Sequence, residues 1–156
     1  MTGRRAALSA ALALMAPVAL AACSSGPKGP ELTVSGAFMP QPVTSDLAGG
    51  YLTVTNSGDA ADELVSVTSD LSDDISLHQA AGDGMRQVTT LETPAHGTLV
   101  LKRGGSHLMF MSLSRKPVEG DRVSVQLHFA KTAPVTLDVP VEAPTFNPKQ
   151  DHDHER

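Results

Sequence analysis

The sequence predicts an all-β domain, a β-sandwich or barrel of eight or nine short strands. Between residues 122 and 129, apolar and polar side chains alternate strictly, as on a strand with one buried face. The same alternation returns over 135–139. Turn residues separate short apolar segments throughout 31–143, and no stretch of this region has the periodicity of a helix of normal length.

Nine segments of this region have the composition of strands: 32–39, 50–56, 64–69, 75–79, 85–88, 98–101, 107–113, 122–129 and 135–139. Gly, Pro, Asn and Asp cluster in the connections at 56–59, 82–84 and 117–121, where they favour turns. We expect a hairpin turn at 102–106, whose sequence is Lys-Arg-Gly-Gly-Ser. Short strands at this spacing are typical of a sandwich or barrel.

Residues 1–22 have the features of a secretory signal peptide. Two arginines precede an apolar run over 6–20, which is shorter than the roughly 20 residues that a spanning helix needs. The Leu-Ala-Ala-Cys sequence that ends at Cys23 is similar to the bacterial lipobox. We therefore expect Cys23 to carry a lipid that anchors the protein to the cell membrane outside the cytoplasm, and 23–30 to be a flexible tether. An ordinary signal peptide with an incidental cysteine is the alternative.

Composition limits the possible partners of the mature chain. The full sequence has a net charge of −5, which becomes −7 without the two arginines of the signal peptide, and it has no basic stretch and few aromatic residues, which argues against a nucleic-acid partner. Cys23 is the only cysteine, so no disulfide can stabilise the domain. We expect one monomeric domain over 31–143, followed by a disordered tail over 144–156 that is rich in His and Asp.

Histidine and methionine recur at a spacing that suggests a metal site. Met85 is followed by twenty-one residues and then by His107-Leu108-Met109. His107 and Met109 are two residues apart, so on a strand they point to the same face. With the imidazole of His78, these residues form a set of two imidazoles and two thioethers, a combination that suits Cu(I).

Other chemistries fit the sequence poorly. A blue-copper electron carrier needs a thiolate ligand, and the only thiol belongs to Cys23 at the expected lipid anchor. No nucleophile, histidine and carboxylate, and no pair of carboxylates, have a spacing that indicates catalysis, so we expect that the protein is not an enzyme.

Several segments together resemble the PCu(A)C family of bacterial extracytoplasmic copper chaperones: 49–56, 76–78, 85–88, 94–97, 104–111 and 120–121. The resemblance covers roughly residues 30 to 141. The interval of twenty-one residues matches the family motif, whereas six residues separate His78 from Met85, four fewer than in the motif. Because an even number of residues is lost from the hairpin, the side chain of His78 keeps its face.

The resemblance implies a cupredoxin-like β fold and a Cu(I) site formed by His78, Met85, His107 and Met109. It also implies delivery of copper to the dinuclear centre of cytochrome c oxidase subunit II, with a Sco-like copper protein as a further partner. A copper-buffering lipoprotein that sequesters Cu(I) for resistance is the alternative, because its ligands would be the same.

The sequence contains further His and Met residues, whose roles need to be considered separately. Met111 shares the strand face of Met109; the resemblance makes Met109 the ligand, and an exchange of their roles is the alternative. His152 and His154 form a weak candidate for Cu(II) or Zn²⁺, with a solvated acidic tail as the alternative. We expect His96 and His128 to be exposed, and Met39 to pack in the core.

Overall fold

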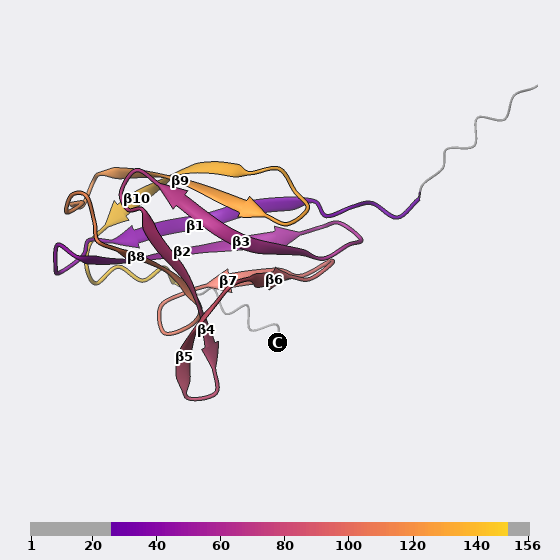
Figure 1. The fold of residues 1–156 in the computed structure, drawn as a ribbon, viewed down its shortest axis with the longest axis horizontal. Helices are drawn as coiled ribbons and strands as arrows, with labels where there is room; N and C mark the ends of the chain where they lie inside the picture. The colour runs from indigo at the N-terminus through magenta and orange to yellow at the C-terminus, as the bar shows by residue number, and fades with distance from the viewer. Residues whose placement is uncertain (1–25, 150–156) are drawn as a thin grey trace, which may run out of the picture.

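The computed structural model describes residues 26–149 and confirms the all-β prediction, because these residues form ten strands and no helix (Figure 1). None of them therefore lies in a helix that could cross a membrane. The predicted signal peptide, Cys23 and residues 150–156 lie outside the described residues. The strands are β1 (Leu32–Pro40), β2 (Leu47–Asn56), β3 (Asp62–Ser69), β4 (Asp74–Ala81), β5 (Gly84–Val88), β6 (Leu91–Thr93), β7 (Thr98–Leu101), β8 (His107–Met111), β9 (Arg122–Phe129) and β10 (Val135–Glu142).

The strands follow one hydrogen-bonded path that folds over on itself into a sandwich. The order along this path is β5-β4-β8-β2-β1-β10-β9-β3-β6, and β7 pairs with β2 beside β8. A short parallel pairing of β1 with β10 joins the two halves. The apolar residues of both halves meet in one buried cluster, which includes Met39 at 0% exposure and thereby confirms its expected packing role.

Strands β7 and β8 do not form the hairpin that the sequence predicts at 102–106. Both pair antiparallel with β2, with β7 opposite 52–55 and β8 opposite 47–50. They therefore continue each other along β2, and residues 102–106 are looped out between them. The backbone N–H of Lys102 donates to the carbonyl of Ser106 at 2.9 Å and closes the loop, in which Gly104 has a φ of 73°. The loop thereby places His107, the first residue of β8, next to β7 along the edge of β2.

Strand β6 is the element that the sequence did not predict. It has three residues, which is too short for an alternating pattern to be recognised. Leu91 and Thr93 point into the core with 2% and 0% of their surface exposed, and Glu92 between them is exposed. The strand pairs with β3 and lies beside β7, so it helps to close the sandwich (Figure 1).

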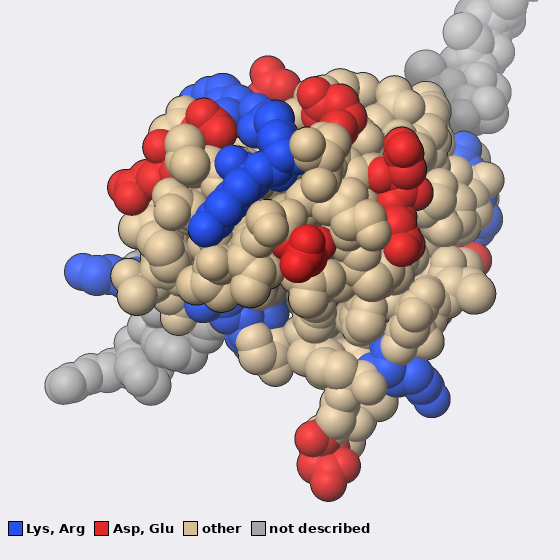
Figure 2. Space-filling view, turned by 60° about the vertical axis from the view of Figure 1, so that its left-hand side comes forward, with Lys and Arg blue, Asp and Glu red and all other residues tan. Residues whose placement is uncertain are grey.

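Strands β4 and β5 form a hairpin that projects from the body of the sandwich (Figure 1). A turn at Gly82-Asp83 joins them, and Figure 2 shows an acidic residue at its tip. Residues 80–87 are exposed, since β5 is the edge strand and only β4 pairs with it. The hairpin is therefore an arm attached to the body through the pairing of β4 with β8.

The end of the predicted tether packs against the domain. The backbone N–H of Lys28 donates to Oδ2 of Asp59 at 2.7 Å, and the carbonyl of Lys28 accepts from the backbone N–H of Asp59. A Cβ on Gly58 would lie 2.0 Å from the carbonyl oxygen of Gly29, so the close approach requires glycine. The prediction of a flexible tether over 23–30 is therefore wrong for 28–30, because pairing with a distant loop cannot be read from local composition.

The start of the predicted disordered tail also has a defined position. The ring of Phe146 packs edge-on against Phe38 with the ring centroids 5.1 Å apart. The backbone N–H of Phe146 donates to the carbonyl of Ala143 at 2.9 Å, and the guanidinium of Arg103 donates to the carbonyl of Pro144. The prediction of disorder is therefore wrong for 144–149, since one aromatic side chain anchors this segment to β1.

Asp62 is expected to make the stability of the domain depend on acid pH. Its side chain is 1% exposed and accepts hydrogen bonds from the backbone N–H groups of Glu63, Lys131 and Thr132 and from the Thr132 hydroxyl. Burial by itself would raise the pKa of Asp62, but these hydrogen bonds outweigh it and hold the pKa below the usual 3.8. The ionised carboxylate therefore contributes stability above about pH 4, which is lost as the pH falls further through the lowered pKa.

Replacement of Asp62 with asparagine should lower the free energy of unfolding by about 2 kcal/mol at pH 7 and flatten its fall below about pH 4. Urea denaturation of both proteins at pH 7 and at several acid pH values measures the two effects. The same acid dependence in both proteins would contradict this role for Asp62.

Candidate metal centre

The pairing of β4 with β8 brings the two predicted histidines together. His78 lies directly opposite His107 in the register. Their rings are nearly parallel, at an interplanar angle of 16°, and their centroids are 5.1 Å apart. Both side chains are half-buried. Two imidazoles that are distant in the sequence thus form one stacked pair on the surface of the sheet.

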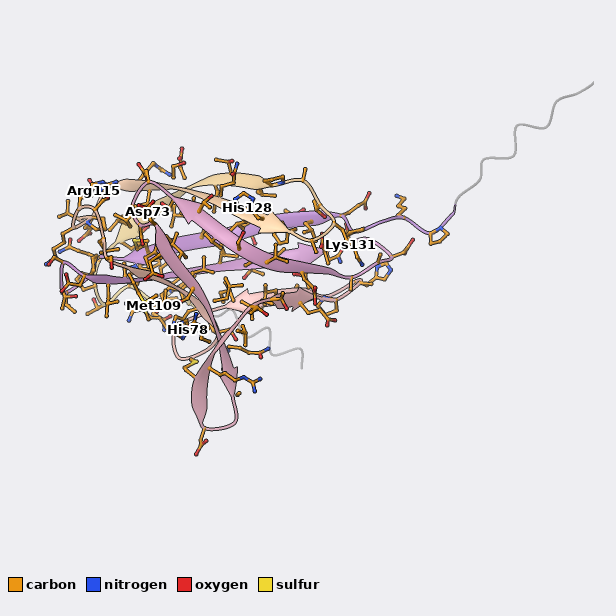
Figure 3. All side chains as sticks on the ribbon, in the orientation of Figure 1. Asp73, His78, Met109, Arg115, His128 and Lys131 are labelled. Carbon is orange, nitrogen blue, oxygen red and sulfur yellow. The ribbon has the colours of Figure 1, made fainter. Side chains whose placement is uncertain are left out.

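Both predicted methionines lie on the face that carries this pair. Met109 is two residues beyond His107 on β8 and lies opposite Ser76, which is two residues before His78 on β4. Met85 on β5 lies opposite Ala80, two residues after His78. Figure 3 shows His78 and Met109 close together near the base of the β4–β5 hairpin. The expectation that the shortened hairpin keeps His78 and Met85 on one face is confirmed.

The ring of His107 is held in one orientation by its own loop. Its Nδ1 lies 3.1 Å from the carbonyl oxygen of Gly105. A carbonyl can only accept, so Nδ1 carries the proton and Nε2 presents its lone pair. The backbone N–H of Ala80 donates to Oγ of Ser106, which ties this loop to β4. His107 is therefore orientated for coordination through Nε2, in the way that a hydrogen bond on the other nitrogen orientates metal-binding histidines.

His78 has a hydrogen-bonding partner on its own strand. Its Nε2 lies 2.9 Å from Oγ of Ser76, a side chain that is 7% exposed. Burial lowers the pKa of His78, and the neighbouring His107 lowers it further by charge repulsion. The lowered pKa favours the neutral ring, which is the form that binds a metal. When Nε2–H donates to Ser76, Nδ1 is left with the lone pair.

Ser76 and Tyr51 are neighbours of the pair that the sequence did not single out as part of the site. The ring centroid of Tyr51 on β2 is 6.3 Å from that of His107. Gly49 makes room for the tyrosine, because a Cβ there would lie 2.9 Å from the hydroxyl of Tyr51. Ser76 could have been found from its position two residues before His78, whereas Tyr51 depends on the pairing of β2 with β8.

The remaining candidates lie further from the histidine pair. Met111 shares the outer face but lies opposite Asp74, one cross-strand row beyond Met109. His96 is exposed as expected, with Nε2 2.8 Å from Oδ1 of Asp59. His128 is half-buried, against expectation, and its Nε2 lies 3.0 Å from the Thr68 hydroxyl.

His152 and His154 lie outside the described residues. Within 26–149, no three side chains of His, Cys, Asp or Glu are grouped closely enough to hold a metal ion. The face with His78, His107, Met85 and Met109 instead combines imidazole and thioether donors.

Known proteins resemble this chain over most of the described domain. The sequence model of the family described as "Putative lipoprotein LpqE-like" matches residues 32–141. A curated relative, "Putative lipoprotein Lxx21020" of Leifsonia xyli subsp. xyli, is 30% identical over 102 residues. This match covers 61% of the present chain and 61% of the relative, so the chain spans about three fifths of the relative's length.

Solved structures with a similar fold include PCuAC domains. A copper-bound PCuAC domain from PmoF2 is 27% identical with a TM-score of 0.66, over 72% of this chain and 93% of that domain. The Cu(I) form of DR1885 from Deinococcus radiodurans is 27% identical with a TM-score of 0.63, over 80% of this chain and 85% of the other. The expected cupredoxin-like β fold is thereby confirmed. The chain belongs to the LpqE-like lipoprotein family, and its domain has the fold of the PCuAC copper proteins.

Proposed function

We propose that this protein is an extracytoplasmic metallochaperone that binds one Cu(I) through His78, Met85, His107 and Met109 and passes it to another protein. The strand register carries the proposal, because it puts the two imidazoles directly opposite each other and the two methionines on the same face. Thioether and imidazole together favour Cu(I) over Zn²⁺ or Mg²⁺. Similarity to PCuAC structures that contain copper supports this assignment.

The exposure of Met85 suits a site that gives up its metal. Its side chain is 45% exposed on the edge strand of the projecting hairpin, whereas Met109 is half-buried on β8. A partner protein can therefore approach the copper from the side of Met85 and replace this ligand. The two histidines and Met109 would hold the ion during the exchange.

Titration of the purified protein with Cu(I), in the presence of a competing chelator and without oxygen, tests the binding step. We expect one tight equivalent, and X-ray absorption of the loaded protein should show both nitrogen and sulfur ligands. Substitution of His78 with alanine should remove one nitrogen ligand. Failure to bind Cu(I), or equal affinity for Zn²⁺, would refute the proposed site.

The two outward methionines of β8 should differ in their contribution to binding. Met109→Ala removes a donor next to the histidine pair and is expected to weaken Cu(I) binding strongly. Met111→Ala removes a thioether one row further away and should have a smaller effect. The same chelator competition measures both variants. The reverse order would assign the ligand to Met111.

Cys23 is proposed to carry the lipid anchor, in keeping with the lipoprotein description of the family. Cys23→Ser should release the protein from the membrane fraction or block its processing. Membrane fractionation and mass spectrometry of the two proteins measure this. Unchanged membrane association together with an unchanged mass would contradict lipidation.

The proposed acceptor is the dinuclear copper centre of cytochrome c oxidase subunit II, directly or through a Sco-like copper protein. Deletion of the gene should lower oxidase activity under copper limitation, and added copper should restore it. The loaded protein should also transfer Cu(I) to the isolated copper domain of subunit II or to the Sco-like protein. Normal oxidase activity with increased sensitivity to excess copper would instead identify a buffering protein.

A further inference from the structure

Aromatic and imidazole rings form an unbroken row across four neighbouring strands of the sheet. The row consists of Phe38 on β1, Tyr51 on β2, His107 on β8 and His78 on β4. Phe38 lies opposite Tyr51 in the register, and His107 lies opposite His78. The successive ring centroids are 5.1, 6.3 and 5.1 Å apart. Each ring therefore limits the movement of the next.

The C-terminal segment 143–149 adds a fifth ring to one end of this row. The ring of Phe146 packs on Phe38 at an interplanar angle of 75°, the edge-to-face arrangement that aromatic pairs prefer. Phe38 is 6% exposed although its register partner Tyr51 is on the outer face of the sheet. Phe146 thus covers a side chain that would otherwise meet solvent.

The same segment also contacts the loop that holds His107. The guanidinium of Arg103, in the looped-out residues 102–106, donates to the carbonyl of Pro144. Gly105 in this loop accepts the hydrogen bond from Nδ1 of His107. The segment is therefore connected to His107 in two ways. Phe146 contacts the row of rings, and Pro144 contacts the loop whose Gly105 holds the ring of His107.

We propose that the segment 143–149 is a clamp for the metal site, with Phe146 and Tyr51 as positioning residues that hold the ring of His107 in its binding orientation. This inference rests on the proposed function. A ligand ring that is already ordered loses less conformational freedom when the metal binds, so the clamp strengthens binding without contacting the metal. The ring of Tyr51 is required for this effect, and its hydroxyl group is not.

The chain contains one tyrosine and no tryptophan, so the fluorescence of Tyr51 reports on the row of rings directly. In the purified metal-free protein, Phe146→Ala should lower the anisotropy of the Tyr51 emission. The same substitution should weaken Cu(I) binding about tenfold in the chelator competition, within the 10–100-fold range of substitutions around metal ligands. Phe146→Tyr adds a second fluorophore, so its affinity alone is measured, and it should retain the affinity of the unaltered protein.

Variants of Tyr51 separate the ring from the hydroxyl group. Tyr51→Phe should keep the affinity for Cu(I), and Tyr51→Ala should lower it as Phe146→Ala does. An equal loss in Tyr51→Phe and Tyr51→Ala would overturn the inference, as would a Phe146→Ala protein with unchanged anisotropy and affinity. If the unaltered protein does not bind Cu(I), the proposed function fails, while the anisotropy of metal-free Phe146→Ala still tests the clamp. Thermal unfolding shows whether each variant is folded, and Phe146 is only half-buried.

Discussion

Replacement of His107 with alanine is expected to lower the affinity for Cu(I) by more than about 100-fold. Loss of a residue that merely supports a metal ligand already costs 10–100-fold in other sites, and His107 is proposed to be a ligand itself. Among the proposed ligands, His107 also has the most contacts that hold its ring in place. It stacks on His78, lies close to Tyr51 and is hydrogen-bonded to the carbonyl of Gly105. Competition with a Cu(I) chelator measures the change.

The matched control for this experiment is His128→Ala. His128 is likewise a half-buried strand histidine, but it lies on β9 and is hydrogen-bonded to Thr68 of β3. Its removal should leave Cu(I) binding unchanged. If both alanine variants bind Cu(I) as the unaltered protein does, the site proposed on β4, β5 and β8 is wrong.

Phe110→Ala is expected to have the largest effect on folding. Phe110 is 1% exposed, and it lies on β8 between Met109 and Met111 but points in the opposite direction, into the core. Its ring packs so closely on β2 that a Cβ on Gly50 would lie 2.8 Å from Cε2. Loss of a buried phenylalanine side chain costs about 3–5 kcal/mol, a large part of the 5–15 kcal/mol that stabilises a typical domain.

Two variants show whether this loss comes from the core. Phe110→Leu retains most of the apolar volume and should cost less than about 1.5 kcal/mol. Met111→Ala changes the neighbouring residue, which points outward, and should change the free energy of unfolding less than Phe110→Ala does. Chemical denaturation of the three variants measures these differences, and a loss as large in Met111→Ala as in Phe110→Ala would contradict the assignment of the two faces.

Alternation within a strand could be read from the sequence, and it correctly placed side chains on their faces. On β8 the exposed fractions alternate as expected, so that His107 and Met109 face outward and Phe110 faces the core. The shortened β4–β5 hairpin keeps His78 and Met85 on one face for the same reason, because the side-chain period of a strand is two residues. The fold class and the placement of the candidate donors on one face were therefore predictable.

Pairing between distant segments could not be predicted in the same way. Local sequence carries no sign that β7 and β8 continue each other along β2, and the prediction of a hairpin turn at 102–106 is therefore wrong. The proximity of Tyr51 to His107 follows from the pairing of β8 with β2. The packing of Phe146 on Phe38 was hidden because the surrounding residues are mainly polar or proline. Each of these features depends on tertiary contacts over a long sequence separation.

If Cys23 carries the proposed lipid, the attachment of Lys28 to Asp59 limits how far the domain can stand from the membrane. With the lipid proposed at Cys23, only four residues, 24–27, separate the anchor from the attachment point, and the five Cα-to-Cα steps between Cys23 and Lys28 span at most about 18 Å. The domain, and with it the proposed metal site, would then stay close to the bilayer. Confinement of this kind raises the effective concentration of the domain toward acceptors in the same membrane. It also disfavours acceptors whose copper sites stand far above the surface.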